Sequence, residues 1–223
     1  MSGASSSVPS TEHGTNPTFA PFRSADGVVN DDRDAHGPLA HSHRPRPGIL
    51  LDRDGTLIVD YGYVGSVDRV RLIGGAPEAI ARFNQAGIPV AVLTNQSGVA
   101  RGYYGTADVE RVHDYIAVRL AEYGAHIDLF LYCPYHPDGV VAAFTGDSEH
   151  RKPRPGMALA AAKALNLDLS SSWVVGDRPE DVALAEAIGA SAIYVGPARA
   201  FRPSVLSLPN LTAAACAILE RVA

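Results

Sequence analysis

Short apolar runs alternate with longer amphipathic stretches from residue 48 onward. The short runs predict buried strands, and they span 48–51, 88–93, 127–132, 173–176 and 192–195. The amphipathic stretches predict helices, and they span 77–86, 106–123, 156–165, 179–188 and 211–222. Strands that alternate with helices form βα units, so the pattern predicts an α/β domain with a parallel sheet.

The first 47 residues differ in composition and have no hydrophobic period. They are rich in Ser, Pro, Gly, Asp and His, and their few apolar residues follow no period. A segment of this kind buries too little apolar surface to offset the entropy of ordering it. We therefore expect a disordered leader over 1–47 and a single domain over 48–223, which is an ordinary domain size.

Polar residues follow three of the predicted strands at the point where each ends. Asp52 follows the first strand, Thr94 and Asn95 follow the second, and Asp177 follows the fourth. In open α/β sheets, ligands bind beyond the carboxyl ends of the strands. The sequence therefore predicts that these side chains share one site.

The segment LDRDGTL (51–57) carries two aspartates separated by one residue. Asp52 can attack phosphorus as a nucleophile, since carboxylates form covalent aspartyl-phosphates. Asp54 can protonate the leaving oxygen and then deprotonate the attacking water, as a general acid/base. The same letters also fit an ordinary Asp-Gly turn after a strand.

Two further segments supply groups that suit a phosphoryl group. In LTNQSG (93–98), Thr94 offers a hydroxyl donor and Asn95 an amide donor, although a capping loop has the same composition. In RKPRPG (151–156), Lys152 offers a positioned charge and Arg151 a guanidinium fork, although an exposed basic loop would look similar.

The segment VVGDRPEDV (174–182) adds acidic residues. Asp177 and Asp52 together offer the carboxylates that a hard cation such as Mg²⁺ prefers. Mg²⁺ would offset the repulsion between a phosphate and an attacking carboxylate. Asp181 lies one turn into the next helix, where it would orient Lys152 or a metal-bound water, or simply complement the helix dipole.

These four segments, in this order, resemble those of the haloacid dehalogenase-superfamily phosphatases over residues 48–195. The branch that resembles the chain most contains the D-glycero-D-manno-heptose 1,7-bisphosphate 7-phosphatases and the histidinol-phosphatases. The resemblance implies a Rossmann-like, three-layer parallel sheet with little or no cap domain. It implies that the catalytic residues are Asp52, Asp54, Thr94 and Lys152. It also implies Mg²⁺ bound by Asp52, the backbone carbonyl of Asp54, and Asp177.

Two segments favour the heptose enzymes within this branch. DYGYV (60–64) and TNQSGVARGYY (94–104) resemble their substrate-contacting stretches. The implied reaction removes the 7-phosphate of the heptose bisphosphate in nucleotide-heptose biosynthesis. The implied substrate-binding residues are Asp60, Tyr61, Gly62, Tyr63, Asn95, Gln96, Ser97, Arg151 and Arg178. A histidinol-phosphate or broad small-molecule phosphatase is the alternative enzyme, and a phosphate-sensing domain is the alternative without turnover.

Relatives in this branch often carry a structural zinc, bound by a Cys-x-His pair and a Cys-x-Cys pair after the third strand. Here those positions read Cys133-Pro134-Tyr135 and Ser148-Glu149-His150, so Cys133 alone matches. Cys133, His136 and His150 leave an altered site open, but a closed zinc site needs four ligands. We expect no structural zinc.

Charge and composition limit the kinds of partner that we expect the protein to bind. The formal net charge of −5 gives no basic footprint for nucleic acid. No apolar run approaches the roughly 20 residues that span a bilayer, and no secretory signal opens the chain. Two unrelated cysteines indicate a reducing compartment. We expect a cytoplasmic monomer whose partner is a small phosphorylated sugar, with no nucleic acid and no membrane.

Overall fold

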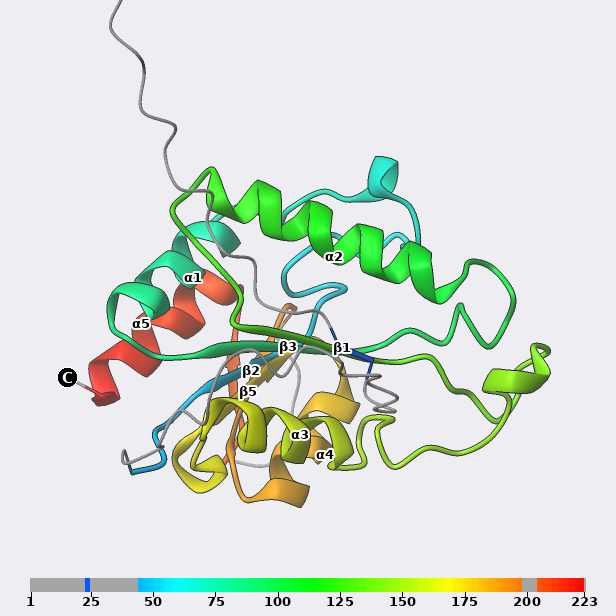
Figure 1. Ribbon diagram of the computed structural model, residues 1–223. Helices are drawn as coiled ribbons and strands as arrows, with labels where there is room; N and C mark the ends of the chain where they lie inside the picture. Colours follow the sequence, from blue (N-terminus) through cyan, green and yellow to red (C-terminus); the bar gives the residue numbers. More distant parts are fainter. Residues whose placement is uncertain (1–22, 25–43, 198–203, 223) are drawn as a thin grey trace, which may run out of the picture.

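In the part of the chain that the structure describes, seven parallel strands form one sheet at the centre (Figure 1). The computed structural model describes residues 23–24, 44–197 and 204–222. The strand order is β1-β4-β3-β2-β5-β6-β7, and every neighbouring pair is parallel. The strands are β1 (Arg23–Ser24), β2 (Ile49–Leu51), β3 (Val90–Asn95), β4 (Leu129–Cys133), β5 (Trp173–Gly176), β6 (Ser191–Val195) and β7 (Leu206–Leu208). The predicted α/β class is confirmed.

Helices cover both faces of the sheet and make three layers (Figure 1). One face carries α1 (Ala76–Gln85), α2 (Thr106–Ala121) and α5 (Leu211–Val222). The opposite face carries α3 (Gly156–Leu165) and α4 (Pro179–Ile188). Short 3-10 turns lie at Val67–Arg69, Ala142–Phe144 and Leu169–Ser171. None of the described helices is both long and apolar enough to cross a membrane.

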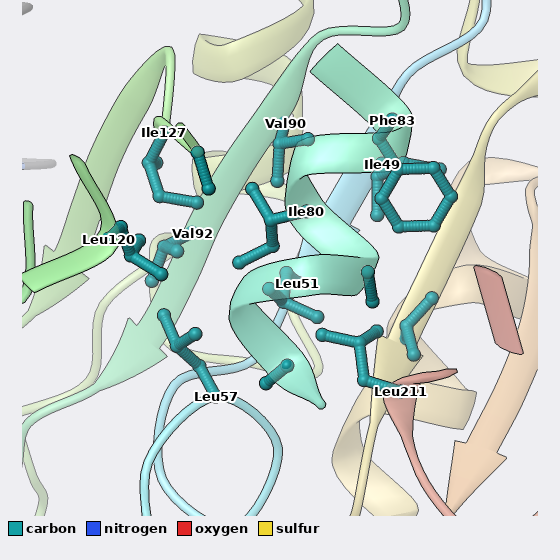
Figure 2. Close-up of a cluster of buried hydrophobic side chains, with 14 of the residues drawn as sticks. Ile49, Leu51, Leu57, Ile80, Phe83, Val90, Val92, Leu120, Ile127 and Leu211 are labelled. Atoms are coloured by element: carbon teal, nitrogen blue, oxygen red, sulfur yellow. The ribbon is translucent and has the colours of Figure 1, made fainter. Parts of the chain in front are cut away.

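The central strand β2 is buried on both faces, which is why its sequence is continuously apolar. Ile49 and Leu51 point to the core beneath α1, where Ile80 and Phe83 pack against them (Figure 2). Leu50 belongs to the second core, on the face that α3 and α4 cover. Because side chains alternate along a strand, three residues serve both cores.

From the central strand β2, the chain forms first one side of the sheet and then the other. From β2 it moves outward through β3 to β4, and then returns to β5 on the other side of β2. This reversal of direction is a topological switch point, where α/β sheets bind their ligands. The segment between β2 and α1 contains one 3-10 turn and no further domain, which confirms the predicted lack of a large cap.

Parts of the expected leader lie against the domain. Arg23–Ser24 forms β1, which pairs with β4, and the described chain resumes at residue 44. The backbone of Arg46 accepts a hydrogen bond from Asp168 and donates one to Asn166. Ordered backbone therefore begins before Gly48. The rest of 1–43 lies outside the described residues, so disorder there stays a prediction.

Candidate active site

The three central strands deliver the predicted polar residues to one edge of the sheet. Asp52 follows β2, Thr94 and Asn95 end β3, and Asp177 follows β5. A cavity of about 350 Å³ opens at this edge. Its lining residues are Asp52, Asp54, Asp60, Gly62, Tyr63, Thr94, Asn95, Gln96, Ser97, Tyr104, Arg151, Lys152, Arg178, Glu180 and Asp181. The four predicted catalytic residues thus lie together.

Eight of the nine expected substrate-binding residues also line this cavity, and Tyr61 does not. Tyr61 is 55% exposed and is not one of the lining residues. Tyr104 and Glu180 line the cavity although we did not single them out from the sequence. Tyr104 falls at the end of the segment 94–104, but nothing in its letters distinguishes it from the neighbouring Tyr103.

Lys152 joins two of the acids. Its ammonium donates to Asp52 Oδ1 and to Asp181 Oδ1, each at 2.7 Å, and all three side chains are buried. Asn95 fixes the backbone of Lys152 from both sides, because its Oδ1 accepts from the amide at 3.0 Å and its Nδ2 donates to the carbonyl at 3.1 Å. These two hydrogen bonds therefore attach the loop 151–156 to the end of β3.

Burial and charge shift the titration of this group. Burial alone would lower the pKa of Lys152, but the Asp181 and Asp52 carboxylates outweigh it and raise that pKa. Burial raises the pKa of Asp52 against the opposing effect of Lys152. Burial and the nearby Asp52 charge raise the pKa of Asp177 to about 7. Burial and the neighbouring carboxylates therefore disfavour the ionised forms of Asp52 and Asp177.

The same acids fit a hard cation. Among the described residues, the one group of three or more His, Cys, Asp or Glu side chains whose ligand atoms lie within 4.8 Å of one another is Asp52, Asp177 and Asp181. Asp177 Oδ1 is buried and has no hydrogen-bond partner. Both oxygens of Asp181 are engaged, by Lys152 and by the backbone N–H of Arg178 at 3.0 Å. Asp52 and Asp177 are thus the freer carboxylates.

Gly55 allows the chain to pass close to this group. Its φ is +85°, and a Cβ at this position would lie 2.2 Å from Asp177 Oδ2. A residue with a side chain would have to displace the carboxylate. The turn that carries Asp54 and Gly55 is therefore packed directly against Asp177.

The Asp54 carboxyl is held by Arg53, which is fully buried. Arg53 donates from Nη2 to Asp54 Oδ1 at 3.0 Å and from Nε to Asp54 Oδ2 at 3.1 Å. Arg53 is anchored by the backbone carbonyl of Val64 at 2.9 Å and lies 3.3 Å from His113 Nε2. Burial raises the pKa of Asp54, against the opposing effect of Arg53. The role of Arg53 is not visible in the sequence, because it depends on how the side chain folds back.

An ion pair joins Arg178 and Asp60, which both line the cavity. Arg178 donates to Asp60 Oδ2 at 2.6 Å, which links the loop 60–64 to the start of α4. Arg69 holds the same loop by donating to the backbone carbonyls of Tyr61, Gly62 and Tyr63. The pair also shows that Arg178 shares its charge with a carboxylate rather than facing the cavity alone.

The loop after β4 is organised around His136. The His136 carbonyl accepts from the amides of Gly139 and Gly146, and its own amide donates to Phe144. Its ring nitrogens lie 3.3 and 3.4 Å from Arg101 Nη2. Cys133, His136 and His150 do not form a ligand group of the kind that the three aspartates form. The expected lack of zinc stays a prediction.

Comparison with known proteins gives the class of this site. The HAD-hydrolase-like family model matches residues 149–206. The D-glycero-beta-D-manno-heptose-1,7-bisphosphate 7-phosphatase of Yersinia pestis is 43% identical over 145 residues, which are 64% of this chain and 77% of the relative. The enzyme of the same name from Rhodopseudomonas palustris is 43% identical over 144 residues, or 65% of this chain and 80% of the relative.

A solved structure of a phosphatase has a similar fold. The D,D-heptose 1,7-bisphosphate phosphatase of B. bronchiseptica, complexed with magnesium and phosphate, has a TM-score of 0.71 and 32% identity, and the match covers 78% of this chain and 99% of that one. Fold, site and relatives together define a hydrolase of the haloacid dehalogenase type. The chain belongs to the haloacid dehalogenase superfamily, as a phosphatase of the branch that contains the heptose 1,7-bisphosphate 7-phosphatases.

Proposed function

We propose that the chain removes the 7-phosphate from D-glycero-D-manno-heptose 1,7-bisphosphate with Mg²⁺, through an aspartyl-phosphate on Asp52. The observation that carries the proposal is the buried Lys152 ammonium, which lines the cavity and donates to Asp52 and Asp181 at 2.7 Å. An ammonium has three donors, so one remains for a phosphoryl oxygen. The names of the relatives support the choice of substrate.

In the first half-reaction, a carboxylate oxygen of Asp52 attacks phosphorus and the bond from phosphorus to the leaving oxygen breaks. Asp54 transfers its proton to that oxygen, which departs as the sugar alcohol. In the second, a water oxygen attacks the phosphorus of the aspartyl-phosphate, the bond from phosphorus to the Asp52 oxygen breaks, and Asp54 takes a proton from the water. Inorganic phosphate leaves, and Asp52 and Asp54 return to their starting forms.

The other residues act on charge. Lys152 and Thr94 stabilise the phosphoryl oxygens as negative charge builds up. Mg²⁺, held by Asp52, Asp177 and the backbone carbonyl of Asp54, would supply neutralisation of the repulsion between phosphate and carboxylate. The fit rests on the buried, unpartnered Oδ1 of Asp177 and on the close approach of the Asp54–Gly55 turn.

The residues that line the cavity would recognise the substrate. Arg151 lines the cavity and donates to the backbone carbonyl of Tyr135 at 3.3 Å, which leaves further guanidinium donors for an anionic or hydroxyl group. Gly62, Tyr63, Asn95 and Ser97 complete the wall beside it. A polar cavity open to solvent suits a small phosphorylated sugar. The cytoplasmic location and the monomeric state both stay predictions.

Phosphate release from a panel of substrates tests this proposal. The panel contains both anomers of heptose 1,7-bisphosphate, histidinol phosphate and fructose 1,6-bisphosphate, each with Mg²⁺ and with EDTA. We expect release that depends on Mg²⁺ and is fastest on a heptose bisphosphate. Fastest release from histidinol phosphate would replace the substrate and keep the chemistry. No release from any compound, with Mg²⁺ bound, would favour a phosphate-sensing domain.

A further inference from the structure

Gln96 lies in the cavity wall but is only 2% exposed. Its amide nitrogen donates to Asp54 Oδ2 at 2.8 Å and to Thr94 Oγ1 at 2.9 Å. A primary amide has two N–H donors, and both are therefore engaged within the protein. Gln96 has no donor left for a sugar hydroxyl, although its sequence position suggested substrate contact.

Tyr104 determines which end of the Gln96 amide faces Asp54. The two ends have nearly the same shape, so their hydrogen-bond partners set the orientation. The Tyr104 hydroxyl donates to Gln96 Oε1 at 2.8 Å, which directs the NH₂ group toward Asp54 and Thr94. Burial raises the pKa of Tyr104 to about 12, so the hydroxyl keeps its proton and remains a donor near neutral pH.

The Tyr104 ring is seated by two glycines from different loops. A Cβ at Gly65 would lie 2.1 Å from the ring, and one at Gly98 would lie 2.3 Å from it. Side chains at these positions would push the ring away from Gln96. The packing of the loops 60–65 and 96–104 thus fixes the hydroxyl in place.

Asp54 is consequently held from two directions. Arg53 contacts both carboxylate oxygens from one side, and the Gln96 amide contacts Oδ2 from another. Three N–H donors restrict the carboxyl group in both rotation and position. Because Thr94 Oγ1 accepts from Gln96, its own proton must be donated to another group, which suits a phosphoryl oxygen.

We infer that Tyr104 and Gln96 are positioning residues, which act on the reaction by holding Asp54 for proton transfer rather than by contacting the sugar. The inference rests on the proposed function, because it assigns Asp54 the role of general acid/base. Its chemical consequence lies in the first half-reaction, where the bond from phosphorus to the leaving oxygen breaks. Poor leaving groups need the proton from Asp54 at that moment, whereas a p-nitrophenolate departs without it.

A leaving-group series tests the inference. The value of kcat/KM, which reports the steps up to release of the leaving group, is measured with Mg²⁺ for substituted phenyl phosphates and for benzyl phosphate. The variants are Tyr104→Phe and Gln96→Met. The control is Tyr115→Phe, which removes a partly buried hydroxyl that accepts from Arg119 at 3.2 Å, away from the cavity. Melting temperatures establish that each variant is folded.

For Tyr104→Phe and Gln96→Met, we expect kcat/KM to fall about ten-fold on benzyl phosphate and less than about two-fold on p-nitrophenyl phosphate. The plot of log kcat/KM against leaving-group pKa should therefore steepen, while Tyr115→Phe keeps the wild-type slope. An unchanged slope with an equal loss on every compound would overturn the inference and leave Gln96 as a binding residue. If Tyr104→Phe does not fold, the slope of Gln96→Met decides.

The two proposals fail in different ways. Wild-type protein that releases phosphate with Mg²⁺ neither from these esters nor from the sugar phosphates of the panel contradicts the proposed function, and the positioning role falls with it. Wild-type protein that hydrolyses them, together with variants of unchanged slope, contradicts the positioning role alone.

Discussion

The ammonium nitrogen of Lys152 lies 2.7 Å from Asp52 Oδ1, across a distance of 100 residues in the sequence. This contact places a cation on the carboxylate that must approach a negatively charged phosphate. It also orients one Asp52 oxygen and leaves the other for attack on phosphorus. Lys152 can do both because the Asn95 side chain holds its backbone in place.

Replacing Lys152 should therefore affect both stability and turnover. In Lys152→Met, two buried carboxylates lose their common partner, and the free energy of unfolding should fall by about 3 kcal/mol at neutral pH. The loss of charge at the phosphoryl oxygens should lower kcat by at least about 100-fold. Urea unfolding and phosphate release measure the two effects. Lys163→Met, on the exposed side of α3, is the control. It should change the free energy of unfolding by no more than a few tenths of a kcal/mol and kcat by no more than about two-fold.

Gly55→Ala should disrupt the cation site through sterics. Both Gly55 and Gly124 have positive φ, at +85° and +66°, so alanine at either costs about 1 kcal/mol of backbone strain. A Cβ at Gly124 meets nothing within 4 Å, whereas one at Gly55 meets the Asp177 carboxylate. We expect Gly55→Ala to weaken Mg²⁺ binding at least about ten-fold and Gly124→Ala to leave it unchanged. Calorimetric titration with Mg²⁺ measures this, and equal affinities in the two variants would contradict the assignment of Asp177.

Binding of Mg²⁺ should depend on pH through Asp177. Its folded-state pKa of about 7 is raised above the ordinary value of 3.8, so its contribution to stability is present below pH 3.8 and is lost as pH rises through about 7. Mg²⁺ binds the ionised form and must displace a proton at lower pH. The affinity for Mg²⁺ should therefore be about ten-fold weaker at pH 6 than at pH 8. Asp177→Asn should bind weakly at both pH values, and an equal wild-type affinity at pH 6 and pH 8 would contradict this account.

Much of the sheet was predictable because it depends on local patterns. The run before Asp52 is apolar on both faces, and β2 is buried on both faces, so length and composition identified it. The strand β7 was missed because Leu206–Leu208 is a short edge strand whose three residues are only half-buried. The strand β1 was missed because it has two residues inside a segment without periodicity. Edge strands of this length obtain their pairing from the neighbouring strand rather than from their own sequence.

The site was predictable where a residue acts through its position in the chain. Asp52 and Asp177 follow strand ends and Thr94 lies at the end of β3, and the parallel sheet brings these strand ends together. Arg53 and Tyr104 were missed because their roles depend on side-chain direction and on packing between loops. Gln96 was predicted to bind substrate and it lines the cavity, but its hydrogen bonds to Asp54 and Thr94 are a three-dimensional property that spacing does not reveal.

The covalent step on Asp52 is the central claim, and trapping the phosphoryl-enzyme tests it most directly. Wild-type protein and Asp52→Asn are mixed with substrate and Mg²⁺, quenched in acid within milliseconds to seconds, and digested for peptide mapping. We predict a hydroxylamine-labile phosphoryl group on the peptide that contains Asp52 in the wild type, and none in the variant, which should release no phosphate. Label on another residue, or phosphate release by Asp52→Asn at a rate near that of the wild type, would contradict the account.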